Sequence, residues 1–244
     1  MMFRYIYILL LSLIFNQDLT VDDIINRIDF NLNSENRILT CKMIIHGRRT
    51  SRTIVSKNWI VGADKAFTEY LSPPRESGSK MLKLDDILLT YSPQTDRIIQ
   101  ISGHMLKQSV MGSDFSYNDI MEDKPLDELY SAKIEGVDYI NGRKCYVLFL
   151  EAKVTGISYP KRREWVDQEY FLPIKEELYA KSGKLLKSTS MDGIKKIGDR
   201  WFPTRCIFKD ELKKNSKGTE WIIDDIQFDV DIPDKLFSKS NLTK

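Results

Sequence analysis

The sequence predicts a mainly β protein with minor α content, built on a single strongly curved antiparallel sheet. Between residues 37 and 231, apolar and polar side chains alternate with a period of two in one segment after another. Nearly all of these segments are joined by short turns, which places consecutive strands side by side and antiparallel. No helical pattern of 10–15 residues separates them, as a parallel α/β fold would require. We count ten or eleven strands, and a sheet of that size curls or closes.

The first predicted element is a helix that begins after Thr20. Thr20 and Asp23 have the spacing of a capping box, with Asp in place of Glu. One apolar stripe then covers two turns at the spacing i, i+3, i+4, i+7, formed by Val21, Ile24, Ile25 and Ile28. We expect the helix to end before the polar residues 31–36 and its stripe to pack against the sheet that follows.

The strand-like segments form two series. The first series comprises residues 37–46, 53–61, 66–71, 81–84, 87–91 and 97–102, with Pro73-Pro74 interrupting regular structure. The second comprises residues 130–140, 143–153, 163–167, 170–181, 184–195, 201–212 and 219–231. Asn141-Gly142 joins the first two segments of this second series and is the strongest short hairpin signal. A short turn or helix at residues 232–242 ends the chain.

Residues 111–121 lie between the two series and have neither strand nor helix periodicity. Gly112 permits a tight bend, and Ser113 or Asp114 can cap a short turn. Apolar side chains occur at irregular spacing, at Phe115, Tyr117, Ile120 and Met121. We interpret this segment as a flap over the concave side of the sheet. The alternative is a crossover loop that only fills a core.

The composition describes a chain that can bury a core and stay in solution. Of 244 residues, 42% are hydrophobic and 30% are charged, which is compatible with a single large β domain. The 37 basic and 35 acidic residues give a formal net charge of +2. Phosphate binding needs a concentrated basic face, so this balance gives no reason to expect nucleic acid as a partner.

The N-terminus differs from the rest of the chain. Arg4 precedes an apolar run over residues 5–15, and polar residues resume at Asn16. This run has the length of the apolar region of a signal peptide and is short for a membrane span. No pair of small residues marks a cleavage site before Asn16. We therefore expect residues 1–17 to be a signal peptide or an uncleaved N-terminal anchor, and residues 18–244 to be one exported domain.

Motifs for catalysis or metal binding are missing from the sequence. His46 and His104 have no carboxylate or thiol at ligand spacing, and no GxSxG, P-loop or GxGxxG sequence occurs. The three cysteines, Cys41, Cys145 and Cys206, each lie in an apolar strand-like segment. Burial as small hydrophobic side chains is the expected role, and one disulfide with a remaining thiol is the alternative. The sequence therefore favours binding over catalysis, with no metal and no cofactor.

Several segments resemble the LolA-like outer-membrane lipoprotein-sorting protein family. They are Ser77-Gly78-Ser79-Lys80-Met81-Leu82, Leu89-Thr90-Tyr91-Ser92-Pro93, Arg97-Ile98-Ile99-Gln100-Ile101, Met111-Gly112-Ser113-Asp114-Phe115-Ser116-Tyr117 with Asp119-Ile120, Cys145-Tyr146-Val147-Leu148, Trp165-Val166-Asp167, Gly183-Lys184-Leu185-Leu186-Lys187 and the ending from Phe237 to Leu242. The resemblance runs from about Asp22 to the C-terminus, and the segment that begins at Met111 carries it most strongly.

The resemblance implies a half-open, LolA-like β-barrel with a helix or loop lid. It also implies a periplasmic carrier that binds the acyl chains of a lipid or lipoprotein and shuttles them towards the outer membrane. Its partners would be an inner-membrane transporter and an outer-membrane acceptor, and the chain would be a monomer. Burying one sixteen-carbon acyl chain at roughly 0.8 kcal/mol per CH₂ gains about 12 kcal/mol before the costs of binding. A dry apolar concavity is sufficient for that purpose.

Strand alternation and the flap together give a set of candidate lipid-binding residues. We expect the cavity or its lid to contain Leu39, Met43, Ile45, Leu89, Tyr91, Ile99, Ile101, Met105, Met111, Phe115, Tyr117, Leu148 and Leu150. The simplest alternative is that these side chains fill the concavity themselves. Two other functions stay open. One is a non-catalytic envelope module that binds a membrane protein or a peptide. The other is a hydrolase, which requires a Ser or Asp hydrogen-bonded to His46 or His104.

Overall fold

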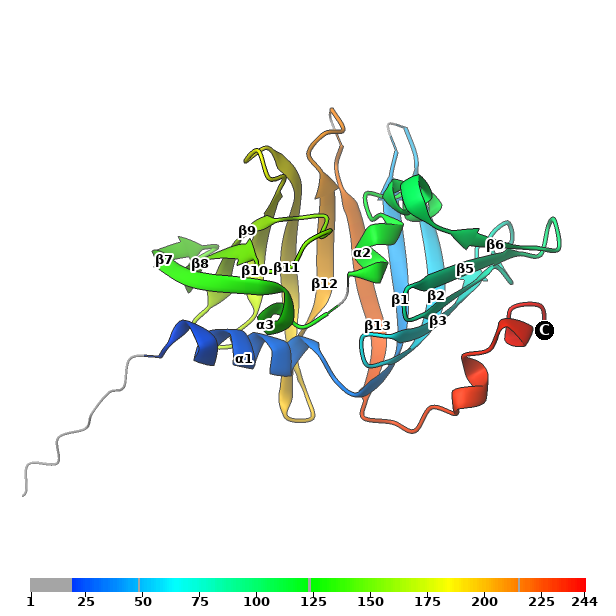
Figure 1. Ribbon diagram of the computed structural model, residues 1–244, viewed down its shortest axis with the longest axis horizontal. Coiled ribbons are helices and arrows are strands. Elements are labelled where there is room, and N and C mark those ends of the chain that lie inside the picture. Colours follow the sequence, from blue (N-terminus) through cyan, green and yellow to red (C-terminus); the bar gives the residue numbers. More distant parts are fainter. Residues whose placement is uncertain (1–18, 48, 123, 215) are drawn as a thin grey trace, which may run out of the picture.

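In the part of the chain that the structure describes, thirteen strands form one continuous antiparallel sheet (Figure 1). The computed structural model describes residues 19–47, 49–122, 124–214 and 216–244, so the predicted signal or anchor segment lies outside the described residues. The predicted fold class is confirmed. The count of ten or eleven strands was too low, because every segment with alternating polarity in both series forms a strand.

The strands are β1 (Asn36–His46), β2 (Ser51–Val61), β3 (Lys65–Ser72), β4 (Lys80–Leu84), β5 (Ile87–Ser92), β6 (Arg97–Ile101), β7 (Tyr130–Ile140), β8 (Arg143–Ala152), β9 (Lys161–Asp167), β10 (Pro173–Tyr179), β11 (Leu185–Ile197), β12 (Arg200–Asp210) and β13 (Thr219–Phe228). The helices are α1 (Val21–Leu32), α2 (Tyr117–Met121) and α3 (Leu126–Leu129). Short 3₁₀ turns form η1 (Gly103–Lys107), η2 (Val110–Gly112), η3 (Asp234–Leu236) and η4 (Lys239–Asn241).

The order of the strands leaves the sheet open between β6 and β7. The order is β6-β5-β4-β3-β2-β1-β13-β12-β11-β10-β9-β8-β7, so the first and last strands pair in the middle and β6 and β7 are the two edges. Residues 102–129 connect these edges, and this topology carries the connection across the concave face. Within the second series, Asn141 and Gly142 both have positive φ, as the predicted tight hairpin between β7 and β8 requires.

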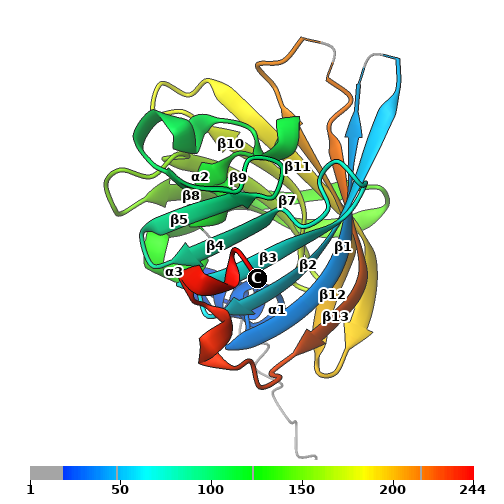
Figure 2. The same cartoon turned by 90° about the vertical axis from the view of Figure 1, so that its right-hand side faces the viewer.

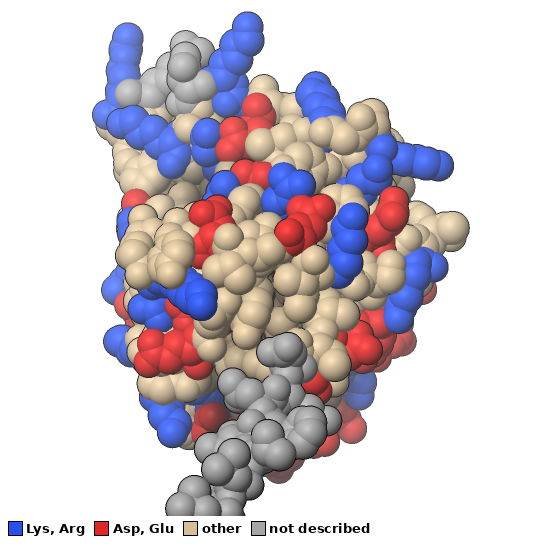
Figure 3. Space-filling view, turned by 90° about the vertical axis from the view of Figure 1, so that its left-hand side faces the viewer, with Lys and Arg blue, Asp and Glu red and all other residues tan. Residues whose placement is uncertain are grey.

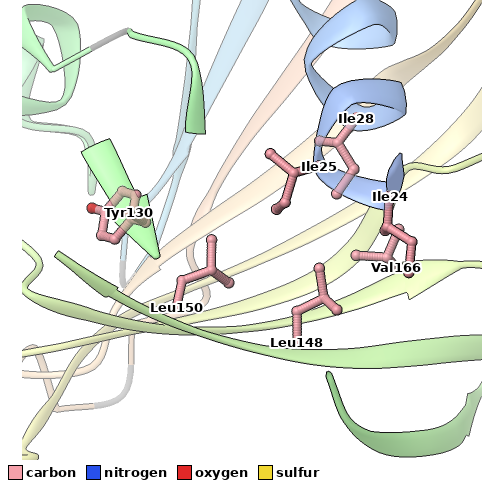
Figure 4. Packing of buried hydrophobic residues seen from close by; sticks show 7 residues of the cluster. All are labelled: Ile24, Ile25, Ile28, Tyr130, Leu148, Leu150 and Val166. Atoms are coloured by element: carbon pink, nitrogen blue, oxygen red, sulfur yellow. The ribbon is translucent and has the colours of Figure 1, made fainter. Parts of the chain in front are cut away.

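Helix α1 covers the concave face at the β7–β9 end of the sheet (Figure 4). The predicted capping box between Thr20 and Asp23 is present. The predicted packing of the helix against the sheet is confirmed, and Ile24, Ile25 and Ile28 contact β7, β8 and β9. The two halves of the sheet curve toward one another, so the helix reaches strands that are distant in sequence.

The end of α1 differs from the prediction. The helix continues to Leu32 because Asn31 is buried and bonded, not solvated. Its side-chain amide donates to the carbonyl groups of Tyr170 and Phe171 at 2.9 and 3.3 Å, and its carbonyl oxygen accepts from the N–H of Trp201 at 2.9 Å. These three hydrogen bonds to distant residues offset the weak helix propensity of Asn31.

The C-terminal segment packs on the convex face, over the first series of strands (Figure 2). Ile232, Phe237 and Leu242 are buried against Phe67 and Leu82. The predicted short turn or helix at residues 232–242 is therefore present as η3 and η4. Strands β3, β4 and β5 consequently have apolar side chains on both faces.

Surface charges of both signs surround an apolar area on the face shown in Figure 3. Among the residues with described structure, no helix combines the length and the apolar character needed to cross a membrane.

Candidate functional site

The flap predicted around Met111 is part of the connection that crosses the concave face. In the structure the flap extends beyond the predicted residues 111–121 and comprises Gly103–Met121, which form η1, η2 and α2. Met111 and Gly112 both have positive φ, which reverses the chain and points Phe115 at the sheet. Beside β4–β6, Met105, Tyr117 and Ile120 pack on the buried side chains of Met81, Leu88 and Ile101. The segment thus both fills a core at one edge and roofs the centre of the concave face.

An apolar cavity of about 370 Å³ lies between the flap and the centre of the sheet. This volume is within the range of small-molecule binding sites. The floor comes from β1, β2, β3, β4, β11, β12 and β13, and the roof comes from the flap. The apolar lining includes Leu39, Met43, Ile54, Ile60, Tyr70, Met81, Val110, Phe115, Ile120, Met191, Phe202, Cys206, Phe208, Trp221 and Ile223.

Polar groups in the cavity floor satisfy one another. Thr68 donates its hydroxyl to the Asn58 side-chain oxygen at 2.8 Å. The Asn58 amide donates to the Ser56 hydroxyl and the Cys41 sulfur, each at 3.3 Å. Because these buried groups already have partners, an apolar guest leaves none of them with a lost hydrogen bond. The floor therefore favours hydrocarbon over a polar ligand.

Three aromatic side chains join the flap to the floor. The Phe115 ring lies 5.2 Å from the Phe208 ring and 5.3 Å from the Trp221 ring, measured between centroids, with tilted and edge-on geometry. Phe208 and Trp221 project from β12 and β13 into the same cavity. These contacts are worth about 0.5–1.5 kcal/mol each beyond burial. They hold the flap against the floor of the cavity.

Polar contacts anchor the flap at its margins. The Lys83 ammonium donates to the carbonyl groups of Ile120 and Met121 at 3.1 and 3.2 Å, at the C-terminal end of α2, where the helix dipole favours a cation. Asp119 pairs with Lys187 and accepts a 2.6 Å hydrogen bond from the Tyr159 hydroxyl. The flap is therefore attached on both sides of the cavity through charged groups.

A second cavity of about 220 Å³ adjoins the apolar one, and we call it the polar cavity because many charged side chains contribute to its walls. The two share Leu32, Phe115, Asp119 and Phe208 as wall residues. Arg162, Glu176 and Thr189 line the polar cavity from β9, β10 and β11. The concave face therefore has an apolar compartment at its centre and a polar compartment beside α1.

A pair of carboxyl groups, Glu164 fully buried and Glu176 partly buried, belongs to this polar compartment. Glu164 is directly opposite Glu176 across the β9–β10 ladder. Burial, with the Glu176 charge adding to it, raises the pKa of Glu164 to about 8. Burial also raises the pKa of Glu176 above its ordinary value. A single guanidinium, that of Arg162, lies near both carboxyl groups.

The structure brings some of the thirteen candidate residues together at the cavity. Leu39, Met43 and Phe115 line it directly. Ile45 and Met111 pack beside Met43, next to the cavity. Ile101, Met105 and Tyr117 lie in the core between the flap and β4–β6. Eight of the candidates therefore lie in or next to the roofed region.

The other five candidates lie elsewhere. Leu89 and Tyr91 are on the convex face under the C-terminal segment. Strand β5 is apolar on both faces, so the alternation of its side chains could not show which of them face the cavity. Leu148 and Leu150 are on the concave side but are fully buried under α1. Ile99 is on the edge strand β6 and is 48% exposed.

Several cavity residues were absent from the set derived from the sequence. Ile54, Tyr70, Phe208 and Trp221 line the apolar cavity, and Arg162 and Glu176 line the polar one. The same strand alternation marks each of them as a candidate for one face. What the sequence lacked was the identity of the strands that the flap covers, which depends on the curvature of the sheet.

The cysteine side chains are unsuited to nucleophilic chemistry. Cys41, Cys145 and Cys206 are free thiols. Burial raises the pKa of Cys206 to about 12 and that of Cys145 to about 11, so both are protonated near neutral pH. Across the part of the chain with described side chains, no group of three or more His, Cys, Asp or Glu residues is arranged to hold a metal ion.

One histidine has the kind of contact that a hydrolase requires. His46 Nδ1 is 2.9 Å from the Ser51 hydroxyl oxygen, and His46 Nε2 is 2.8 Å from Glu220 Oε1. This constellation is on the convex face, where Arg205 holds Glu220 at 2.9 Å and Asp192 at 2.7 Å. None of these five residues lines the cavities described above. The arrangement is a polar network across β1, β2, β11, β12 and β13.

Comparison with known proteins places this architecture among solved folds. A putative outer-membrane lipoprotein-sorting protein domain from Vibrio parahaemolyticus is 24% identical, with a TM-score of 0.76, over 90% of this chain and 96% of that one. A DUF1329 family protein from Desulfovibrio piger is also 24% identical, with a TM-score of 0.79 and the same coverage of both chains. A LolA superfamily protein from Nitrosomonas europaea is 22% identical, with a TM-score of 0.76, over 92% of this chain and 100% of that one.

The sequence comparisons add a family. No curated protein matches the chain. A family model described as "Uncharacterized protein" matches residues 62–244, which include the flap, the cavity walls from β3 onward and the C-terminal segment. The chain therefore belongs to the family that this model describes, and it has the fold of the LolA-like outer-membrane lipoprotein-sorting proteins.

Proposed function

We propose that the protein is a periplasmic carrier that binds acyl chains of a lipid or lipoprotein in the apolar cavity and moves them towards the outer membrane. The observation that supports this proposal best is the 370 Å³ cavity under the flap, whose polar floor groups are mutually satisfied. Its lining is mainly apolar, and apolar surface gains about 25 cal/mol per Å² when it leaves water.

Release of the cargo requires a roof that opens. The roof here is a connection between two unpaired sheet edges, and the flap is attached to the cavity walls by side chains rather than by strand pairing. Its cavity side presents Phe115, Val110 and Ile120. In this proposal the chain acts as a monomer, and an inner-membrane transporter and an outer-membrane acceptor supply and receive the cargo.

Lipid bound during expression tests the carrier function. We expect native mass spectrometry of the full chain, produced with export, to show a mass addition that denaturation releases as a lipid or an acylated peptide. Substitution of Met43 by Trp fills the cavity from its floor and is expected to remove this addition. Protein that carries no lipid in either form, with the roofed region already occupied by its own side chains, would contradict the proposal.

The Ser51–His46–Glu220 contacts are the specific observation in favour of a hydrolase. A serine nucleophile also needs a substrate pocket and donors for the oxyanion. Since these residues lie on the convex face, away from the cavities, we assign them to joining the strands. Hydrolysis of p-nitrophenyl butyrate by the wild type, lost on substitution of Ser51 by Ala, would restore the hydrolase; we expect no activity that depends on Ser51.

A further inference from the structure

The apolar and polar cavities are neighbours that meet at shared side chains. Leu32, Phe115, Asp119 and Phe208 contribute to the walls of both and form the boundary between them. A hydrocarbon chain that fills the apolar cavity and displaces one of these side chains brings the group at its end into the polar cavity. The charges in that compartment determine which end group fits there.

Most charged groups that line the polar cavity already have partners. Asp119 is paired with Lys187 and Tyr159. Asp29 accepts hydrogen bonds from the backbone N–H groups of Leu126 and Asp127 at 3.0 and 3.3 Å. Glu122 accepts a 2.9 Å hydrogen bond from the backbone N–H of Ser158. The lining cation Lys124 is exposed at the surface. These groups are therefore not the ones that select an end group.

Three groups at the inner end of the compartment, two carboxyl groups and one guanidinium, have a different balance of charge. Glu176 and Arg162 line the cavity. Glu164 is two residues from Arg162 on β9 and opposite Glu176 on β10, so it points to the same side of the sheet. Glu164 is fully buried, and neither of its carboxyl oxygens has a hydrogen-bond partner.

A single guanidinium serves both carboxyl groups. The Nη1 atom of Arg162 is 4.0 Å from Glu164 Oε1, and its Nε donates a 2.8 Å hydrogen bond to the Tyr130 hydroxyl. If both carboxyl groups are ionised, the group carries one uncompensated negative charge in a buried place. Such a charge is costly unless a proton or a cation compensates it.

We propose that the polar cavity holds a cationic, ammonium-type end group of an amphiphile whose hydrocarbon chain occupies the apolar cavity. This inference rests on the proposed carrier function and narrows its cargo. Glu176 is the contact residue, and Glu164 is a positioning residue behind it. An ammonium group supplies three N–H donors and one positive charge, which compensates the carboxyl pair beside Arg162.

When no guest is bound, a proton on the carboxyl pair compensates the negative charge instead. The raised pKa values of Glu164 and Glu176 mean that the pair retains a proton near neutral pH. An ammonium guest replaces that proton, since the pair can ionise fully once a second positive charge is present. Binding of an ammonium amphiphile should therefore release a proton, and binding of a neutral amphiphile of the same length should not.

Isothermal titration calorimetry of the full chain with dodecylamine and dodecanol, each below its aggregation concentration at pH 7.5, tests this inference. We expect dodecylamine to bind about tenfold more tightly than dodecanol, the size of effect that one charge-assisted hydrogen bond gives. Repeating the titration in two buffers with different ionisation enthalpies should show proton release with dodecylamine only. Both comparisons use the wild type and do not depend on a variant folding.

Substitution of Glu176 by Gln provides the second arm. We expect E176Q to bind both ligands with the affinity of the wild type for dodecanol. The matched control is Glu177→Gln, because Glu177 is the next residue on β10, faces the convex side and bonds to Lys175. E177Q should retain the wild-type preference.

The outcomes separate this inference from the carrier function. Equal affinity of the wild type for both ligands, or an amine preference that E176Q retains, would overturn the ammonium site and leave the carrier function standing. If neither dodecylamine nor dodecanol binds, this result would contradict the carrier function and, with it, the ammonium site.

Discussion

Asp114 on the flap and Thr219 on β13 form a reciprocal pair of hydrogen bonds. The backbone N–H of Asp114 donates to the Thr219 hydroxyl oxygen at 2.9 Å, and that hydroxyl donates to Asp114 Oδ2 at 3.1 Å. Both residues are buried. Lys213 adds a 3.0 Å ion pair to the same carboxylate. The flap is thus fixed to the centre of the sheet, next to the aromatic contact between Phe115 and Trp221.

Substitution of Asp114 by Ala should release the flap. The change removes the carboxylate that the Thr219 hydroxyl and the Lys213 ammonium contact, at an expected cost of about 1–3 kcal/mol in the free energy of unfolding. We expect faster amide hydrogen exchange over residues 109–121 and faster uptake of an acyl-chain probe. The control is Asp225→Ala, which changes an exposed residue on β13, the strand that carries Thr219. Unchanged exchange in the flap would show that Asp114 does not hold it.

A pair of tryptophan substitutions tests the placement of the site on the concave face. Met43 lies on the cavity floor, whereas Tyr91 lies on the convex face. Met43→Trp should lower acyl-chain affinity at least about tenfold by occupying the space of the guest, and Tyr91→Trp should leave affinity unchanged. Affinity measured by competition with a fluorescent fatty alcohol checks both. A loss caused by Y91W alone would move the site to the opposite face.

Substitution of Leu150 should change the stability of the fold without changing acyl-chain affinity. The side chain is fully buried between α1 and β8, outside both cavities. Leu150→Ala should lower the free energy of unfolding by about 2–5 kcal/mol, the usual cost of a large-to-small change in a core. Urea denaturation measures this loss. Acyl-chain affinity of the folded fraction should equal that of the wild type, and a large loss of affinity would mean that the guest extends under α1.

The stability of the protein should decrease as the pH rises from about 4.5 to about 8. The folded-state pKa of Glu164, about 8, is above its ordinary value of 4.5, so the folded protein binds the extra proton between these limits. Stability is then highest below the lower limit and falls until the carboxyl group ionises in both states. Each pKa unit is worth about 1.4 kcal/mol, so we expect a total loss of a few kcal/mol from this group.

Urea denaturation at several pH values measures this slope. Glu164→Gln should flatten it, because the amide does not titrate. Glu151→Gln, an exposed change on the neighbouring strand β8, should leave the slope as in the wild type. The same slope in E164Q and in the wild type would show that Glu164 is not the group responsible.

Local patterns in the sequence were sufficient for the strands and the turns. Period-two alternation marked a segment for every strand, although our count of ten or eleven was too low, and Asn141-Gly142 marked a hairpin that has the expected positive φ values. The capping box at Thr20 set the start of α1 correctly. These features depend on residues close together in the chain, which is why one sequence reveals them.

The site was only partly predictable because it depends on contacts between distant segments. Leu88 and Leu89 are both apolar, and only the C-terminal segment on the convex face explains why Leu89 is not in the cavity. Leu148 has the predicted orientation, but α1 covers it. The polar compartment was missed because Arg162 and Glu176 are ordinary charged residues in sequence, and only the fold brings them together beside the buried Glu164.

Saturable uptake of a single hydrocarbon guest is the property on which the proposed function depends. A titration of the full chain with a fluorescent fatty alcohol, followed by the emission of the guest and by the quenching of Trp221 in the cavity wall, measures it. We expect one guest per chain, displacement by an unlabelled fatty alcohol, and loss of uptake in M43W. Emission that rises without saturation, or that is equal in the wild type and M43W, would contradict a binding site under the flap.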